Sequence, residues 1–194
     1  MKKKISFGLI ILLIFIAFTG IFLFSKKTNP NKKNDKNLSS DSILTLKTMK
    51  LTSPVFENRS YLPSKYTCDG ENVNPPLEIS AIPEQTKSLV LIVDDPDAPG
   101  GTWVHWTLWN LAPKLISIRE NSVPQEAIQG ITSFGNIGWG GPCPPSGTHR
   151  YRFKLYALDI LTHQNPKTTA KDLEKVMQGH ILDSAELIGL YQKQ

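Results

Sequence analysis

The chain has 194 residues, which is enough for one domain of about 150 residues and a tail. Its formal net charge of +5 is unevenly placed: residues 1–40 hold eight lysines and one aspartate (net +7), whereas residues 41–194 hold 14 basic and 16 acidic side chains (net −2). Because the part of the chain that can fold is slightly acidic, its charge argues against nucleic acid as a partner.

Residues 1–24 predict a signal sequence or a membrane anchor. Residues 5–24 are almost entirely apolar and follow three lysines, and as a helix they would run roughly 30 Å, enough to cross a bilayer core. No small-residue cleavage site stands out near their end, and no cysteine is present there to receive a lipid. We therefore expect an uncleaved transmembrane helix that holds the domain outside the cytoplasm, with secretion after signal cleavage as the alternative.

Residues 25–41 are polar, rich in asparagine and lysine, and almost free of large apolar side chains. Such a composition cannot bury enough surface to fold, so it predicts a flexible tether. Residues 42–194 then form the predicted domain.

Strand patterns dominate this domain. Alternating or continuous apolar runs predict strands over Leu44–Leu51, Leu77–Ile79, Ser88–Val93, Trp103–Asn110, 114–118, 127–133 and 148–157, and Phe56–Tyr66 is predicted as a loop. Helical patterns come only at the end: a capping box at Thr169 and Asp172 predicts a helix over 170–179, and apolar residues at helical spacing predict a second over 182–191. The fold class predicted is mainly β, an antiparallel β-sandwich with peripheral C-terminal helices.

The stretch 88–110 looks like the centre of a ligand site. After a fully apolar strand come Asp94, Asp95 and Asp97, separated by prolines that take the chain out of the sheet, and then a Gly-Gly reversal. Strict alternation on the return strand predicts one face with Trp103, His105, Thr107 and Trp109, and another with Val104, Trp106 and Leu108.

A second loop, Gly138–Gly147, holds several glycines and prolines and leads into another strand. Alternation on that strand places His149 and Tyr151 in line with the inward apolar residues Phe153, Leu155 and Ala157. The pattern therefore predicts a site at the mouth of the sandwich, formed by Asp95, Asp97, His105, His149 and Tyr151.

Two motif blocks resemble the signatures of the phosphatidylethanolamine-binding protein (Raf kinase inhibitor-like) family, and they are most similar to its short bacterial and archaeal branch. They are Asp95-Pro-Asp-Ala-Pro99 with Trp103-x-His105-Trp106, and Gly141-Pro-Cys-Pro-Pro-Ser-Gly-Thr-His149-Arg-Tyr151. The resemblance covers roughly Leu44 to Gln194. It implies a β-sandwich with one small surface pocket for phosphate, acetate or a phospholipid headgroup, formed by Asp95, Trp103, His105, Gly141, Pro142, His149 and Tyr151.

Enzymatic readings fit less well. Two histidines and an aspartate could ligate a metal, but zinc catalysis needs a defined triad and an open position, and a glycine-rich nest beside Arg150 suits an anion better. Ser146 lacks the strand–turn–helix context of a hydrolase nucleophile. We therefore expect non-enzymatic binding with no metal and no cofactor. The alternative is inhibition of a protease or another partner protein, with Gly138–Gly147 as the docking loop.

The chain holds two cysteines, Cys68 and Cys143, each in a turn next to a motif. In an exported domain a disulfide between them is expected, whereas in the cytoplasm they would be two thiols.

Overall fold

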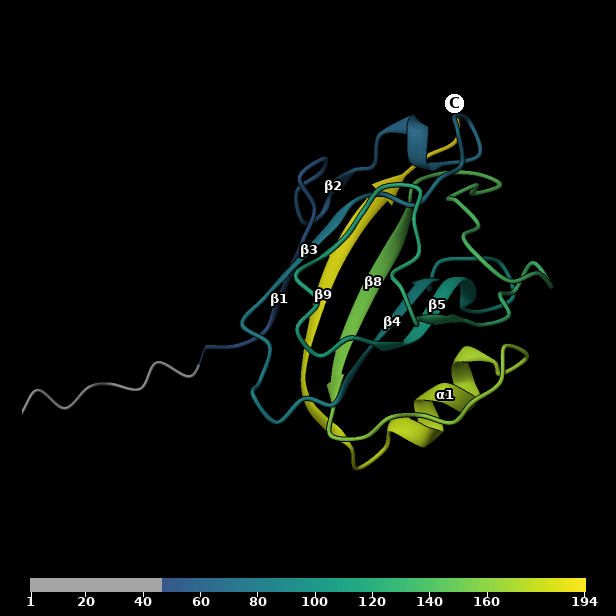
Figure 1. Ribbon diagram of the computed structural model, residues 1–194. Helices are drawn as coiled ribbons and strands as arrows, with labels where there is room; N and C mark the ends of the chain where they lie inside the picture. The colour runs from purple at the N-terminus through teal and green to yellow at the C-terminus, as the bar shows by residue number, and fades with distance from the viewer. Residues whose placement is uncertain (1–46) are drawn as a thin grey trace, which may run out of the picture. The chain divides into compact units, whose positions relative to one another are not determined.

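A computed structural model describes residues 47–194 (Figure 1). The predicted membrane helix at 1–24, the tether at 25–41 and the start of the first predicted strand lie outside these residues. Within residues 47–194, the single long helix is too short and too polar to span a membrane. The elements in chain order are β1 (Lys50–Thr52), β2 (Ser60–Tyr61), η1 (Ser64–Tyr66), β3 (Leu77–Ser80), β4 (Ser88–Asp95), β5 (Trp103–Leu111), β6 (Ser117–Ile118), β7 (Ile128–Gln129), β8 (His149–Leu158), α1 (Ala170–Met177) and β9 (Ile181–Tyr191).

The strands form two sheets, as the mainly β prediction requires. The smaller has the order β1-β3-β6 and the larger the order β2-β9-β8-β4-β5-β7. All their pairings are antiparallel except that of β2 with β9, which is parallel. The long strands β8 and β9 run side by side through the middle of the domain (Figure 1).

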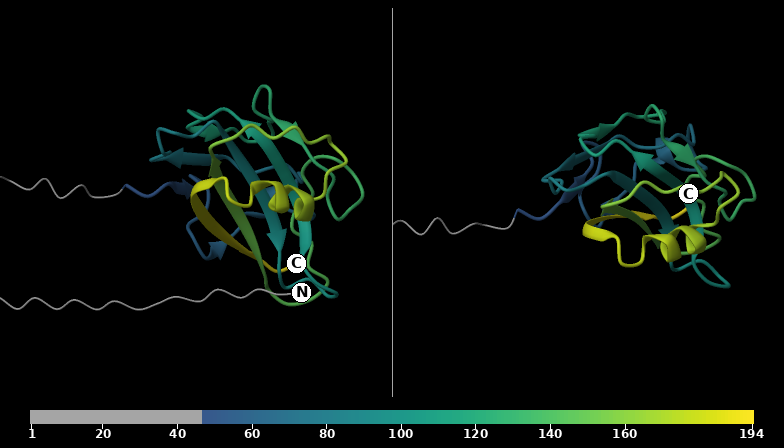
Figure 2. Two further views of the ribbon diagram at one scale, coloured as in Figure 1. Left: turned by 90° about the horizontal axis from the view of Figure 1, so that it is seen from below. Right: turned by 60° about the horizontal axis from the view of Figure 1, so that its bottom comes forward.

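The main core lies between the two sheets. Leucine, valine and aromatic side chains from the inner face of the large sheet pack there against leucine and isoleucine side chains of β1, β3 and β6. On the opposite face of the large sheet, Val90, Ile92 and Trp109 pack against Leu173 and Met177 of α1, which lies across that face (Figure 2). The domain is therefore a two-sheet sandwich with one peripheral helix.

The N-terminus of α1 follows the predicted capping box. Thr169 is the N-cap, and its hydroxyl accepts a hydrogen bond from the Asp172 N–H at 3.2 Å. This bond satisfies one of the backbone donors that a helix start leaves without a partner.

The second predicted helix, over 182–191, is wrong, because these residues form strand β9. β9 pairs with β8 along its whole length, from Ile181 opposite Leu158 to Tyr191 opposite His149. Ala185 and Ile188 share a face only in a helix, but Ala185, Leu187 and Tyr191 also recur at the even spacing of a strand face. The hydrogen bonds offered by β8 decide between the two. Gly189 lies against Leu62, where a side chain would collide.

The strict alternation expected on β5 is also wrong, because a β-bulge interrupts it. Val93 pairs with Trp106 but the next residue, Asp94, pairs with Val104, so His105 is an extra residue on β5. The bulge turns His105 to the same side of the sheet as Trp106, toward the sandwich interior, and away from Thr107 and Trp109. Such bulges commonly re-aim one side chain next to a functional site.

Several predicted boundaries need correction. β1 begins only at Lys50, and the strands predicted over 114–118 and 127–133 shrink to the two-residue strands β6 and β7. The predicted loop Phe56–Tyr66 contains β2 and η1. Short edge strands leave few unpaired backbone groups for another chain to pair with.

Candidate functional site

A cavity of about 310 Å³ opens where β4 ends and where β5 and β8 begin. The inward rows of β4 and β8 are apolar in the core and become polar at this end, at Asp95, His149 and Tyr151. The residues that line the cavity are Asp95, Ala98, Pro99, Trp103, His105, Phe134, Cys143, Pro144, Pro145 and Tyr151.

The carboxylate of Asp95 is buried (3% exposed) and has two hydrogen-bond partners. Its Oδ2 lies 2.7 Å from Nδ1 of His149, and its Oδ1 accepts a bond of 2.8 Å from the Asp97 N–H. Because carboxylate oxygens can only accept, Nδ1 of His149 is the donor. His149 lies behind Asp95 rather than on the cavity wall, so its direct effect is to orient that carboxylate.

The other two carboxylates of the cluster point elsewhere. Asp94 faces the outer side of the sheet, where it pairs with Arg152 (Nε–Oδ1 2.7 Å) and Lys154 (2.7 Å). Asp97 accepts three bonds from Arg150, one from the backbone and two from the guanidinium. These bonds lower the pKa of Asp97 from 3.8 to about 2. Arg150 is thus already paired, which removes the free guanidinium expected beside the site.

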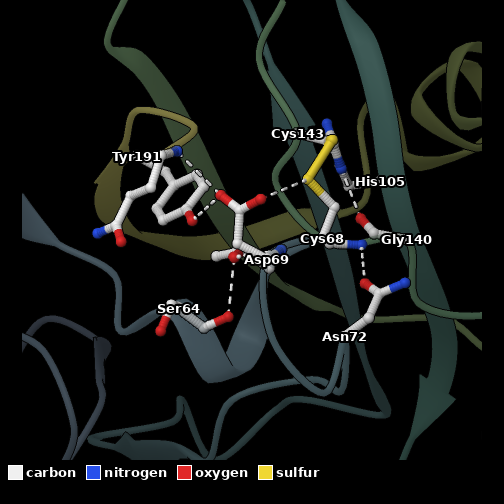
Figure 3. Close-up of a disulfide and its surroundings, with 11 residues drawn as sticks. Ser64, Cys68, Asp69, Asn72, His105, Gly140, Cys143 and Tyr191 are labelled. Atoms are coloured by element: carbon white, nitrogen blue, oxygen red, sulfur yellow. Dashed lines mark hydrogen bonds between the residues drawn. A yellow bond between two sulfur atoms is a disulfide. The ribbon is translucent and has the colours of Figure 1, made fainter.

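His105 is 3% exposed and lines the cavity. Its Nδ1 lies within hydrogen-bond distance of the Gly140 carbonyl (Figure 3), and the Gly140 N–H donates back to the His105 carbonyl at 3.0 Å. A carbonyl only accepts, so Nδ1 carries the proton and Nε2 of the neutral ring is an acceptor. Burial lowers the pKa of His105, which favours this neutral form. Among the described residues, no hydrogen bond engages Nε2.

Tyr151 lies in β8, lines the same cavity and is 1% exposed. Its ring meets that of His105 edge to face, with centroids 5.1 Å apart. The hydroxyl is buried and makes no well-formed hydrogen bond within residues 47–194, although the Asp95 carboxylate and the Cys143 backbone lie near it. Burial, together with the negative charge of Asp95, raises the pKa of Tyr151, so the phenol stays protonated and can donate.

Two partly exposed aromatic rings form the mouth of the cavity. Trp103 and Phe134 are 37% and 45% exposed and meet edge to face, with centroids 5.4 Å apart. Phe134 also contacts the ring of His105. The sequence motifs predicted Trp103, whereas Phe134 lies in a polar loop outside them and was missed.

Gly141 and Pro142 lie behind the cavity wall rather than on its surface. The Gly141 N–H, expected to bind an anion, donates instead to Oδ1 of Asn72 at 2.8 Å. A side chain at Gly141 would meet the backbone of Tyr66 and Thr67. The glycine is therefore needed for close packing of two loops, and its N–H is not free for an anion.

Cys68 and Cys143 form a disulfide with Cα atoms 5.4 Å apart. It joins the cavity wall to the loop that starts at Cys68 (Figure 3). The Cys68 N–H also donates to the Pro142 carbonyl at 3.0 Å. Cys143, Pro144 and Pro145 line the cavity, so this covalent link lies directly beside the site.

Of the seven site residues that the family resemblance implies, Asp95, Trp103, His105 and Tyr151 line one cavity, and Gly141, Pro142 and His149 support it from behind. Asp97, which the residue pattern added, pairs with Arg150 instead. The other two histidines of the chain, His163 and His180, are outside it. Within residues 47–194, no cluster of three or more histidine, cysteine, aspartate or glutamate side chains has the arrangement of a metal site.

Comparison with known proteins gives a consistent answer. The family model described as phosphatidylethanolamine-binding protein matches residues 52–192. A UPF0098 protein of Methanothermobacter thermautotrophicus is 45% identical over 150 residues, which cover 75% of this chain and 99% of that protein. One from Pyrococcus abyssi is 49% identical over 149 residues, covering 73% and 84% of the two chains.

Two solved structures are also similar. A crystal structure of a putative phosphatidylethanolamine-binding protein homologue from Chlamydia trachomatis has a TM-score of 0.74 and 42% identity, covering 76% of this chain and 99% of that one. YbcL of E. coli has a TM-score of 0.71 and 30% identity, covering 75% and 99%. The chain belongs to the phosphatidylethanolamine-binding protein family.

Proposed function

We propose that the protein binds a small anion, or the phosphate-bearing headgroup of a phospholipid, in this cavity and releases it unchanged. The observation that carries the proposal is the Tyr151 hydroxyl, which is buried beside the cavity and makes no hydrogen bond to any residue from 47 to 194. Leaving such a donor unpaired costs about 1–3 kcal/mol, and a ligand oxygen would remove that cost. Membership of the family supports ligand binding as the class of function.

The charge of the cavity sets a condition on this ligand. Asp95 is the one formally charged side chain among the described lining residues, and its charge opposes that of an anion. Uptake of a proton by Nε2 of His105 would convert an acceptor into a charged donor and offset the repulsion. A ligand that carries its own proton or an ammonium group would also meet the condition.

The proposal can be tested with the histidine ring resonances of the full chain. Phosphate and, separately, phosphoethanolamine are titrated while the ring signals are followed by NMR, and His105→Ala assigns the signal of His105. We expect the His105 signal to move with saturation. His180 is the internal control, because it pairs with Asp159 outside the site. No response from His105, or an equal response from His180, would overturn the assignment of the cavity.

Inhibition of a protease or another protein is the second candidate function. It is favoured by apolar side chains exposed near the cavity, Phe134 and Ile137 (52% exposed), and by the loop Gly138–Gly147 that the disulfide holds. Capture of cell-envelope proteins by the full chain tests it, with Phe134→Ser plus Ile137→Ser as the control. A partner retained equally by both proteins does not dock at this rim.

We also propose that residues 5–24 anchor the protein in a membrane, with the domain outside the cytoplasm. The support is the length and apolarity of this segment after three lysines. Cell fractionation followed by protease treatment of intact cells tests it. A soluble, shortened protein would indicate signal cleavage, and a membrane-bound but protected domain would place it in the cytoplasm.

A further inference from the structure

The cavity wall that contains Pro144 and Pro145 has few attachments to the rest of the domain. Upstream of Cys143, Gly140 and Gly141 each donate a backbone hydrogen bond. Downstream, within residues 144–147, no hydrogen bond to the described part of the chain is present, and the two prolines have no N–H to donate. The Pro142 carbonyl accepts a bond from the Cys68 N–H and Pro144 is buried, so this bond and packing hold part of the wall. Beyond Pro142, the disulfide at Cys143 is the one covalent attachment of the wall to another loop in the described part of the chain.

The other end of the disulfide lies in a well-anchored loop. Oδ2 of Asp69 accepts bonds from the Tyr191 hydroxyl (2.5 Å) and from the Gln194 N–H (3.1 Å). The Asp69 and Gly70 N–H groups bond Thr67. The disulfide thus ties a weakly held wall to a fixed loop (Figure 3). Cys68 and Cys143 are both exposed to solvent, so a reductant can reach the bond.

We propose that the Cys68–Cys143 disulfide is a reversible redox site whose reduction releases the Pro144–Pro145 wall and weakens ligand binding. The affinity part of the proposal rests on the proposed function, whereas release of the wall does not. A freed wall spends less time in the arrangement that closes the cavity. The apparent dissociation constant rises as that fraction falls, so a wall in place one tenth of the time weakens binding about ten-fold.

The reductant is a dithiol. One of its thiolates attacks a sulfur of the disulfide and forms a mixed disulfide, while the other protein sulfur leaves as a thiolate. The second thiol of the reductant then displaces the remaining cysteine. The protein S–S bond is broken, an S–S bond forms in the reductant, and two electrons and two protons pass to Cys68 and Cys143.

Binding and reduction must influence each other equally. If reduction lowers the affinity ten-fold, saturating ligand must shift the dithiol–disulfide equilibrium of the protein toward the oxidised form by the same factor. This reciprocity separates a coupled redox site from a disulfide that merely stabilises the fold.

The test uses the full chain with phosphoethanolamine as the probe and dithiothreitol as the dithiol. Affinity is measured in the oxidised, reduced and reoxidised protein, and we expect a loss of about ten-fold on reduction that reoxidation restores. In parallel, NMR order parameters of the Ser146 and Gly147 amides are measured without ligand. We expect them to fall below about 0.6 on reduction while Leu155, in β8, stays near about 0.85.

The double variant Cys68→Ser plus Cys143→Ser is the matched control, because it should behave like the reduced protein and ignore dithiothreitol. Three outcomes would each overturn the redox site. The order parameters of Ser146 and Gly147 could stay unchanged on reduction, the oxidised and reduced forms could bind the probe equally, or Leu155 could lose rigidity as well. If neither form binds any probe but Ser146 and Gly147 alone become mobile, the proposed function fails and release of the wall stands.

Discussion

Replacement of Tyr151 by phenylalanine should separate ligand binding from stability. In the free protein the Tyr151 hydroxyl is buried and has no partner among the described residues. Removing a buried polar group that makes no bond removes a penalty of about 1–3 kcal/mol, and the ring itself is retained. Tyr151→Phe should therefore unfold at the same or a higher urea concentration than the wild type.

Binding should change in the opposite direction. A hydrogen bond from the Tyr151 phenol to a charged ligand oxygen contributes about 1.5–3 kcal/mol. Since about 1.4 kcal/mol is a factor of ten, Tyr151→Phe should weaken phosphoethanolamine binding by roughly 10- to 150-fold. Isothermal titration calorimetry measures this, and urea unfolding followed by tryptophan fluorescence gives the stability of the same samples.

Tyr66→Phe is a matched control with the reverse expectation. Its hydroxyl donates to Oε2 of Glu120 at 2.7 Å, and this bond lies outside the cavity lining. Because the hydroxyl of Tyr66 has a partner, we expect its removal to lower the urea midpoint while binding stays nearly unchanged. If Tyr151→Phe instead lowers stability by more than about 1 kcal/mol, or binds like the wild type, the reasoning about its hydroxyl is refuted.

Three further outcomes are expected. Gly141→Ala should lower the urea midpoint by the equivalent of about 1–3 kcal/mol, because its Cβ would lie 2.7 Å from the Tyr66 carbonyl oxygen. Gly147→Ala is the control: its Cβ meets no neighbour within 4 Å, and its φ of +68° should cost only about 1 kcal/mol of stability. Sulfate, whose charge is constant near neutrality, should bind more tightly as the pH falls from about 8 to about 5, because His105 takes up a proton on binding; a flat profile with no proton uptake in calorimetry contradicts this. Because the pKa of Asp97 is lowered by its pairing with Arg150, this pairing stabilises the fold fully above pH 3.8, and the stabilisation is lost as the pH falls to about 2. Asp97→Asn should remove this pH dependence from acid unfolding curves.

Local patterns predicted the long strands and α1 because local physics decides them. β4 is apolar from Leu89 to Val93, β8 alternates, and Thr169 with Asp172 marks a helix start. Asp95 and Tyr151 line the cavity for the same reason, since they lie at the cavity ends of β4 and β8.

The failures occur where distant parts of the chain decide the structure. Residues 182–191 suit a helix or a strand, and the free edge of β8 selects the strand. Nothing in the local sequence marks His105 as the extra residue of a bulge, which needs the register of two strands. The Gly141 N–H is taken by Asn72, which is 69 residues away in sequence.

The bulge also explains how a core strand can supply a ligand group. Without it, His105 would face the same side as Thr107 and Trp109, where α1 and its neighbours cover the sheet. With it, three strands deliver Asp95, His105 and Tyr151 to one end of the interior face. There Asp95 is satisfied by His149 and by a backbone N–H, whereas the Tyr151 hydroxyl has no partner among the described residues. A ligand would therefore complete the hydrogen bonding of a buried wall, and because it binds only the folded state, it must raise the unfolding temperature as its concentration increases.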